Sequence, residues 1–228
     1  MVSGGVIRLT LAVAALVATA CSGGDESGES VDTIAPSSDS TNSDDPTTLA
    51  ACADDRHMAV FDIVGTLTAD RETAVSWQVE PTVDPPARPL AADLVNAYSE
   101  RGFEILYLSI LPSDFMIGDE PVVDAFMGWL GRNGFPTDPE RTRVETSSTA
   151  APTASELSAD LTTLAGQQVS IDVAYTDSTN DVQAFGVGGV AEVYLLGPDD
   201  AGSSATTIPA DDLAPQLAVV EALPRVCT

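Results

Sequence analysis

The feature that most constrains the fold is a regular alternation of short apolar runs with segments of helical spacing, over residues 57–223. Short apolar runs bounded by turn residues predict buried strands, and apolar residues three or four positions apart predict helices. Strands that alternate with helices pack as a parallel sheet covered on both faces, so we expect an α/β domain. The expected strands are residues 58–61, 103–108, 142–145, 169–174 and 192–196, and the expected helices are 90–101, 119–132, 154–165, 182–187 and 211–223. Residues 73–79 are expected to form a short strand or flap, before the Pro-rich stretch 80–89.

The first 50 residues have a different character from this domain. Residues 1–20 carry one Arg, an apolar run and small residues before Cys21, which is the layout of a secretory signal. This layout resembles a bacterial lipobox, so Cys21 is expected to carry a lipid on the outer face of the cell membrane; an uncleaved membrane anchor is the alternative. Residues 21–50 are acidic, rich in Ser and Thr and without basic residues, which predicts a disordered tether. Residues 51–228 then form one domain, expected to be monomeric.

The charge of the chain excludes some classes of partner. Its formal net charge at pH 7 is −26, and all nine basic residues are Arg. Such a charge argues against nucleic acid as a partner and against electrostatic binding to anionic lipid, and it favours cations. Cys52 and Cys227 bracket the domain, and in an oxidising compartment we expect them to form a disulfide; two free thiols are the alternative.

Asp62 ends the first expected strand and precedes a loop that contains Gly65, Thr66 and Thr68. Ligand sites in open α/β sheets lie just beyond the carboxyl ends of the strands. Asp62 therefore stands where a catalytic carboxylate belongs. On these residues alone, an ordinary Asp that closes a strand before a turn is an equal alternative.

Two other strand ends carry candidate residues. Ser109 follows the second expected strand, and Asp177 and Asp181 follow a later one within the sequence TDSTNDVQAFG, residues 176–186. Hard oxygen ligands on short side chains suit Mg²⁺, which needs only a few carboxylates. Asp and Ser also favour helix N-termini, so these residues could cap the next helix instead of, or as well as, binding a metal.

These segments resemble motifs of the haloacid-dehalogenase (HAD) superfamily of phosphatases. The sequence FDIVGTLT, residues 61–68, is similar to the motif D-x-D-G-T-[LV]-[TS], and residues 176–186 are similar to the acidic motif G-D-[ST]-x-x-D-x-x-[AM]. The sequences at residues 108–112, 129–130 and 134–136 are similar to the lipin-type phosphatidate phosphatase domain and to the C-terminal domain of phosphatidylinositol-transfer proteins. The resemblance implies a Rossmann-like parallel sheet with helices on both faces.

The resemblance also implies a role for each candidate residue. Asp62 would be the nucleophile that forms an aspartyl-phosphate, and the substrate would be a phosphorylated small molecule or lipid. Mg²⁺ would be held by Asp62, Asp177, Asp181 and the backbone carbonyl of Val64 or Ile63, and phosphate oxygens would be bound by Thr66 and Ser109.

The chain departs from the HAD pattern where the motifs supply a proton and a positive charge. Val64 stands at the position of the second Asp, a general acid/base, and Leu111 stands where the lipin-type domain has Arg. The chain has no Lys to neutralise the nucleophile and the phosphate; Arg141 or Arg143 could supply this charge instead. These departures support a second hypothesis, a catalytically inactive lipoprotein that uses the HAD fold to bind a ligand or partner.

Overall fold

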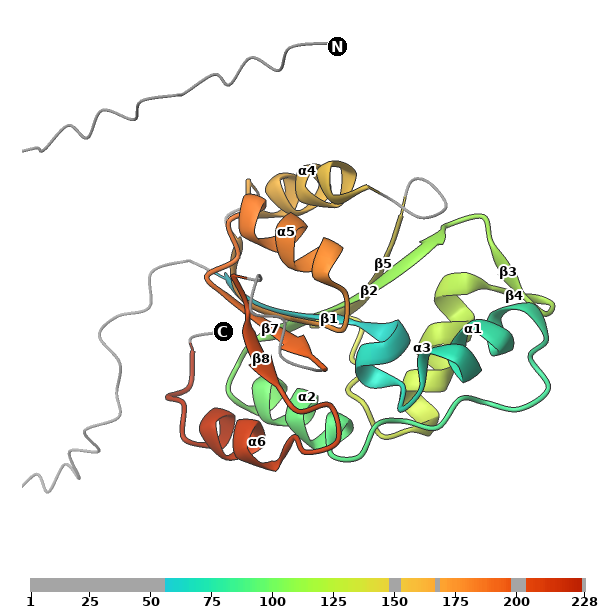
Figure 1. Cartoon of the computed structure of the whole chain (residues 1–228), viewed down its shortest axis with the longest axis horizontal. Coiled ribbons are helices and arrows are strands. Elements are labelled where there is room, and N and C mark those ends of the chain that lie inside the picture. Colours follow the sequence, from blue (N-terminus) through green and yellow to red (C-terminus); the bar gives the residue numbers. More distant parts are fainter. Residues whose placement is uncertain (1–55, 148–152, 167–168, 198–203, 227–228) are drawn as a thin grey trace, which may run out of the picture. The chain divides into compact units, whose positions relative to one another are not determined.

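A six-stranded parallel sheet forms the centre of the protein in this computed structural model, which describes residues 56–147, 153–166, 169–197 and 204–226 (Figure 1). The strand order is β5-β2-β1-β6-β7-β8, and every neighbouring pair is parallel. The strands are β1 (Arg56–Asp62), β2 (Glu104–Pro112), β5 (Thr142–Ser147), β6 (Val169–Thr176), β7 (Glu192–Leu196) and β8 (Thr206–Ile208).

Helices cover both faces of this sheet (Figure 1). The central strand β1 shows why, because it alternates apolar side chains between two hydrophobic clusters. The helices are α1 (Arg71–Val79), α2 (Ala91–Glu100), α3 (Val122–Arg132), α4 (Ala154–Ala165), α5 (Thr179–Val187) and α6 (Ala214–Glu221). Ala59 and Phe61 pack with α2, α3 and α6, whereas Met58 and Val60 pack with α4 and α5. The predicted α/β architecture is confirmed.

Most of the expected elements are present, but residues 73–79 do not form a strand or flap. They belong to helix α1 because Asp70 caps it, its carboxylate accepting a hydrogen bond from the Thr73 backbone N–H at 2.6 Å. Ala74 and Trp77 are buried at helical spacing, which an alternating strand would not allow.

Three short strands were not predicted. β8 closes the far edge of the sheet, and β3 (Met116–Ile117) pairs with β4 (Glu120–Pro121) as an antiparallel hairpin. This hairpin takes up the start of the range expected for a helix at 119–132, so α3 begins only at Val122.

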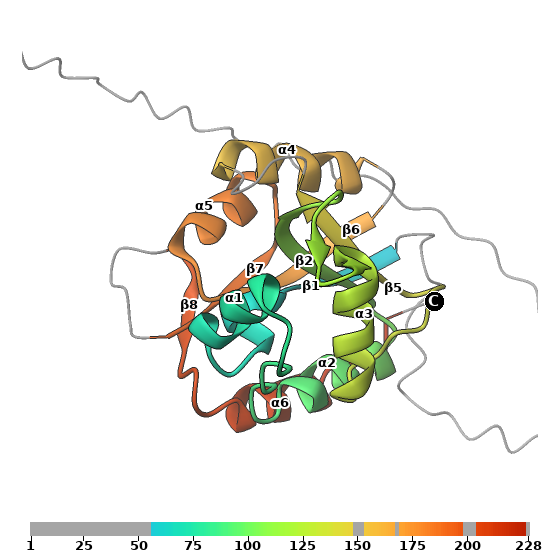
Figure 2. The same ribbon diagram turned by 90° about the vertical axis from the view of Figure 1, so that its right-hand side faces the viewer.

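The edge at which the parallel strands end is the one that matters for function. β1 lies between β2 and β6, with Asp62 in register with Leu108 and Phe61 in register with Tyr175. The segments that follow these three strands therefore emerge side by side. A tight turn, Ile63–Leu67, follows β1, and α1 packs against it at this edge (Figure 2).

Some predictions concern residues outside the described part of the chain. The signal, the acidic tether, Cys21, Cys52 and Cys227 all lie there. Within the described ranges, no helix is long and apolar enough to cross a membrane.

Candidate active site

The turn after β1 contains one position that requires glycine. Gly65 has a φ of +87°, in the left-handed region that side chains disfavour. A Cβ atom at this position would lie 1.9 Å from Oδ2 of Asp177, far inside van der Waals contact. The backbone N–H of Gly65 donates to Oγ1 of Thr68 at 2.8 Å. Glycine therefore allows the Asp177 carboxylate to lie directly against the turn.

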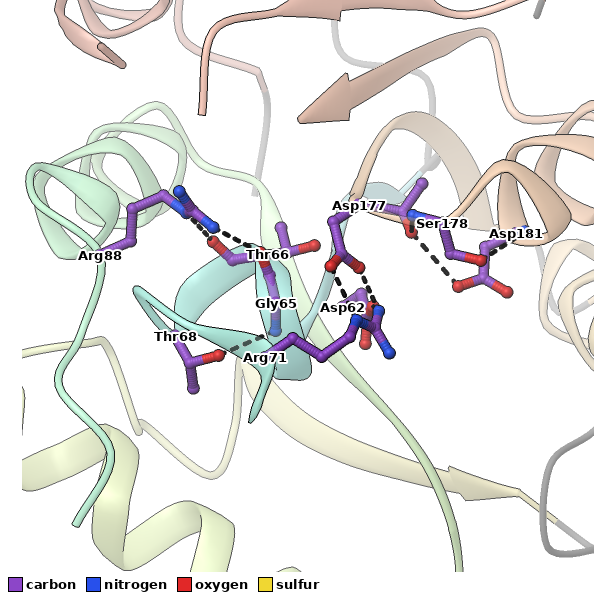
Figure 3. A network of polar contacts seen from close by, with 10 residues as sticks. Asp62, Gly65, Thr66, Thr68, Arg71, Arg88, Asp177, Ser178 and Asp181 are labelled. Atoms are coloured by element: carbon purple, nitrogen blue, oxygen red, sulfur yellow. Dashed lines mark hydrogen bonds and ion pairs between the residues drawn. The ribbon is translucent and has the colours of Figure 1, made fainter. Parts of the chain in front are cut away.

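Arg88 holds this turn in place. Its guanidinium donates to the carbonyl oxygens of Thr66, at 2.8 Å, and of Gly65 (Figure 3). It also donates to the carbonyl oxygen of Ala210. Burial lowers the pKa of Arg88. The planar guanidinium nevertheless has hydrogen-bond acceptors for its donors, because it contacts three carbonyl oxygens. The turn is thereby tied to the segment before α6.

Three carboxylates gather at the end of the central strands (Figure 3). Asp62 ends β1 and is only 5% exposed, while Asp177 directly follows β6. Asp181 lies in the first turn of α5, where its backbone N–H donates to the Ser178 hydroxyl at 3.4 Å. The hydroxyl of Thr176 donates to Oδ2 of Asp181 at 3.2 Å. The helix cap expected for this segment is thus present, in the same few residues as the predicted metal ligands.

Arg71, at the start of α1, is the cation that faces these carboxylates. Its Nε donates to Oδ2 of Asp177 at 2.9 Å, and its Nη2 donates to Oδ1 of the same carboxylate (Figure 3). The same Nη2 lies 3.8 Å from Oδ2 of Asp62. A guanidinium therefore bridges the predicted nucleophile and a predicted metal ligand.

Arg141 and Arg143, the expected sources of this charge, lie elsewhere. Arg141 donates to the carbonyl oxygens of Ser99 and Phe103, at the edge where β2 begins. Arg143 lies within β5, in register with Leu106, and two of its guanidinium nitrogens are buried without a hydrogen-bond partner in the described structure. Among the described residues, Arg71 is the cation that forms an ion pair with Asp62.

The carboxylates outnumber the cation, and this affects their pKa values. Burial is the largest cause that raises the pKa of Asp62 well above its usual value, and the charges of Asp181 and Asp177 raise it further. Arg71 and a hydrogen bond from the Val64 backbone oppose this rise. Burial also raises the pKa of Asp181. Additional positive charge beside Asp62 would therefore favour its ionised form.

The residues present fit Mg²⁺ in their chemistry. They offer hard oxygen donors and surplus negative charge, both of which suit this ion. As they stand, however, the described residues contain no group of three or more His, Cys, Asp or Glu side chains that could hold a metal ion. The Asp177 carboxylate is bound to Arg71 instead. The assignment of Asp62, Val64, Asp177 and Asp181 as ligands stays a prediction.

Asp62 lies between two cavities. The larger has a volume of about 170 Å³, room for several water-sized groups, and is lined by Asp62, Val64, Arg71, Ile110, Ser178, Asn180 and Asp181. The smaller, of about 30 Å³, has room for about one water and lies among more apolar residues, which include Leu108, Leu161 and Leu164. The nucleophile predicted from the sequence is thus reachable from a polar cavity.

The other predicted site residues, Ser109, Thr66 and Val64, differ in how they lie relative to the two cavities. Ser109 does not follow its strand as expected, because β2 continues to Pro112, but it lines the smaller cavity together with Asp62. Thr66 lines neither cavity, and its buried hydroxyl oxygen has no hydrogen-bond partner in the described structure. Val64 is 4% exposed and packs in the cluster with α2 and α3, so the acid/base position is apolar. The phosphate-binding roles of Thr66 and Ser109 are not tested by this geometry.

Three residues of the site were not predicted from the sequence: Arg71 and Asn180, which line the larger cavity, and Arg88, which holds the turn. A signal for Arg71 was present, because Asp70 is a good N-cap residue and apolar residues follow it at helical spacing. Recognising that helix would have placed Arg71 in its first turn, a few residues after the Ile63–Leu67 turn. Arg88 carried no such signal, since its partners are backbone carbonyls distant in sequence.

Comparison with known proteins agrees with this architecture. A family model described as the LNS2 domain of PITM 1-3 matches residues 59–197, more than half of the chain. No curated protein matches the sequence. The matched range includes Asp62, Ser109, Asp177 and Asp181. It confirms the resemblance to HAD-like domains of the lipin and phosphatidylinositol-transfer type.

Several solved structures are similar to this chain, and one of them supports the same fold. A candidate HAD-like phosphatase from Mesorhizobium loti has a TM-score of 0.52 and 15% identity, over 78% of this chain and 91% of its own. A candidate beta-phosphoglucomutase from Thermotoga maritima has a TM-score of 0.46 and 13% identity, over 72% and 99%. The D,D-heptose 1,7-bisphosphate phosphatase from Burkholderia thailandensis has a TM-score of 0.43 and 15% identity, over 74% and 100%. Of these three, the M. loti structure alone exceeds 0.5, and its likeness concerns the fold.

Proposed function

Because the chain belongs to the LNS2 domain family, we propose that it is a Mg²⁺-dependent phosphohydrolase that cleaves a phosphomonoester through an aspartyl-phosphate on Asp62. One observation carries this proposal. Asp62 ends the central strand and is buried, yet it lines a polar cavity beside Arg71 and Asp181. A carboxylate in that position can meet a phosphoryl group while bulk water is largely kept away.

The reaction proceeds in two displacements at phosphorus. In the first, an Asp62 carboxylate oxygen attacks phosphorus, an acyl-phosphate forms, and the bond to the substrate alkoxide breaks. The alkoxide takes its proton from water, because Val64 at the acid/base position has none to give. In the second, water hydrolyses the acyl-phosphate, which restores Asp62 and releases inorganic phosphate. Losing an internal acid typically lowers such a rate by about 10²–10⁴-fold, so turnover is expected to be slow.

The predicted ligands hold the metal in this proposal. Asp62, Asp177, Asp181 and the Val64 carbonyl would bind Mg²⁺, which when bound would screen negative charge and polarise the phosphoryl oxygens. The surplus of carboxylates over cations supports this assignment. Burial and the charges of neighbouring carboxylates raise the pKa values of buried Asp62 and half-buried Asp181, and a bound cation would oppose that rise. The carboxylate–Arg71 contacts partly offset that surplus.

The location and substrate are proposals that rest on the sequence. The signal-like residues 1–20 and the acidic stretch 21–50 support export and a lipid anchor at Cys21. The substrate is a phosphorylated small molecule or a lipid phosphate. The resemblance to lipin-type domains supports a lipid phosphate, and attachment at a membrane would bring the site close to such a substrate.

Release of inorganic phosphate from an aryl phosphate tests the reaction directly. We expect turnover that requires Mg²⁺ and falls by about a thousandfold or more in Asp62→Asn, as it does when a covalent nucleophile is lost. Asp84→Asn is the matched control, because it removes an exposed carboxylate outside the two cavities around Asp62. Turnover in Asp62→Asn equal to that of the wild type would refute the aspartyl-phosphate route.

A second candidate function has its own supporting observation. Val64 is buried in the apolar core at the position of the family's acid/base, which favours binding without turnover. In this case the domain binds a cation, a phosphorylated ligand or an envelope partner. Silence in the phosphate assay, together with a Tm that rises on addition of Mg²⁺, would favour this function.

A further inference from the structure

We propose that Arg71 is the phosphate-binding cation of this site and that it couples the binding of phosphate to the binding of Mg²⁺. The inference deepens the proposed phosphohydrolase function and rests on it. The chain has no Lys, so the positive charge that faces the phosphate must come from another residue. Arg71, which lies outside the motifs, is that residue in this inference.

The contacts of Arg71 show what it is suited to bind. Two of its nitrogens, Nε and Nη2, donate in parallel to the two oxygens of the Asp177 carboxylate. This paired geometry serves carboxylate and phosphate equally well. Arg71 also lines the 170 Å³ cavity that Asp62 lines. Asp177 therefore occupies the fork of donors that a phosphate in this cavity would use.

Arg71 is free to exchange one anion for another. Its side chain is 45% exposed, and the helix cap next to it is made by Asp70 and Thr73, not by Arg71. The other arginine near the loop, Arg88, has its donors committed to three backbone carbonyls. Moving Arg71 from Asp177 to a phosphate in the cavity therefore leaves α1 and the turn intact.

This exchange has a consequence for the metal. Asp177 is a predicted Mg²⁺ ligand, so Arg71 and Mg²⁺ compete for the same carboxylate. A phosphate that draws Arg71 away releases Asp177 to face Asp62 and Asp181. Phosphate and Mg²⁺ should then strengthen each other's binding, by the same factor in both directions.

Isothermal titration calorimetry of the full protein with Mg²⁺, with and without inorganic phosphate, tests the coupling. In the wild type, phosphate should tighten Mg²⁺ binding by about tenfold or more, within the usual range of coupling between sites. In Arg71→Gln, Mg²⁺ alone should bind more tightly than in the wild type, because Asp177 is free. The effect of phosphate on Mg²⁺ affinity should then nearly vanish.

Arg132→Gln is the matched control. Arg132 also forms an exposed ion pair with an Asp, its Nε lying 2.7 Å from Oδ2 of Asp84, and it lines neither cavity around Asp62. It removes the same charge and should leave the coupling unchanged. Arg71→Lys keeps the charge without the paired donors and should retain part of the coupling, which provides a second variant if Arg71→Gln folds poorly.

The outcomes separate this inference from the proposed function. Unchanged coupling in Arg71→Gln, with turnover that still depends on Asp62, would overturn the role of Arg71 and leave the phosphohydrolase standing. Mg²⁺ binding in Arg71→Gln but not in the wild type would mean that Arg71 replaces the metal permanently, which also overturns the coupling. No binding of Mg²⁺ or phosphate by any of these folded proteins would overturn both proposals.

Discussion

Val64 occupies the position at which the HAD motif has its second Asp. It lines the cavity beside Asp62, but its side chain also packs in the core cluster. An Asp there would face the cavity only at the cost of placing another carboxylate beside buried Asp62, whose pKa is already raised by burial and by its neighbours. Compared with the Asp of the HAD motif, Val64 therefore provides no proton donor, but it also adds no further negative charge beside Asp62.

Val64→Asp is expected to raise turnover and to lower stability. A restored acid/base should increase kcat/KM for an aryl phosphate by about tenfold or more, given the usual 10²–10⁴-fold value of such groups. The buried carboxylate should lower the free energy of unfolding by about 1–3 kcal/mol. Val64→Asn is the control, since it has nearly the shape of Asp but cannot transfer the proton. Equal activity in the two variants would show that proton transfer does not limit the reaction.

At the scale of elements, the site depends on how α4 and α5 cover one face of the sheet. α4 packs Leu161 and Leu164 against that face and lines the smaller cavity beside Asp62. It begins with a capping box: the Thr153 hydroxyl accepts from the Glu156 backbone N–H, and the Glu156 carboxylate accepts from the Thr153 backbone N–H at 2.7 Å. The sequence predicted this helix over 154–165, and the prediction is confirmed.

Thr153→Ala should destabilise the domain through this cap. Loss of an N-cap side chain costs about 1 kcal/mol of the free energy of unfolding, which urea denaturation would measure. Thr163→Ala is the control on the same helix, because Thr163 is exposed and its hydroxyl donates only to the carbonyl one turn back, of Ala159. A loss in Thr163→Ala as large as in Thr153→Ala would show that the cap is not the cause.

At the scale of the whole molecule, residues near both ends of the described domain contact the short link between α2 and β2. Near the start of β1, Arg56 forms an ion pair with Glu104. Near the other end, the Val226 backbone N–H donates to the Arg101 carbonyl at 2.7 Å. Arg101 and Glu104 flank the short link between α2 and β2. Arg56 and Val226, at the two ends of the described domain, thus both contact the residues around this link. Cys52 and Cys227 themselves lie outside the described residues.

We predict that the oxidised protein contains a Cys52–Cys227 disulfide. Breaking it should lower stability by about 2–4 kcal/mol, since the bond closes a very long loop. Thiol counting on the denatured protein and Tm with and without reductant would measure this. The Cys52→Ser/Cys227→Ser variant should have the Tm of the reduced wild type and no response to reductant. Two free thiols in the untreated wild type would contradict the prediction.

The sequence by itself determined the class of fold and the main candidate residues. Apolar runs and helical spacing are local patterns, so they identified α4 and β7 over their observed ranges and placed Asp62, Asp177 and Asp181 at strand ends. Those placements needed no knowledge of which strands are neighbours. The motifs then added the HAD resemblance, which the family match confirmed.

Only the tertiary structure decided what surrounds Asp62. Arg71 reaches the site from the first turn of helix α1, which replaces the strand or flap expected at residues 73–79. Asp177 can meet it because Gly65 has no side chain. Arg88 anchors the same turn through carbonyls far apart in the sequence. The strand order and the β3–β4 hairpin were likewise outside the reach of local patterns. The physical reason is that charge pairing and packing act between residues brought together by folding, whereas a sequence pattern reports only on neighbours along the chain.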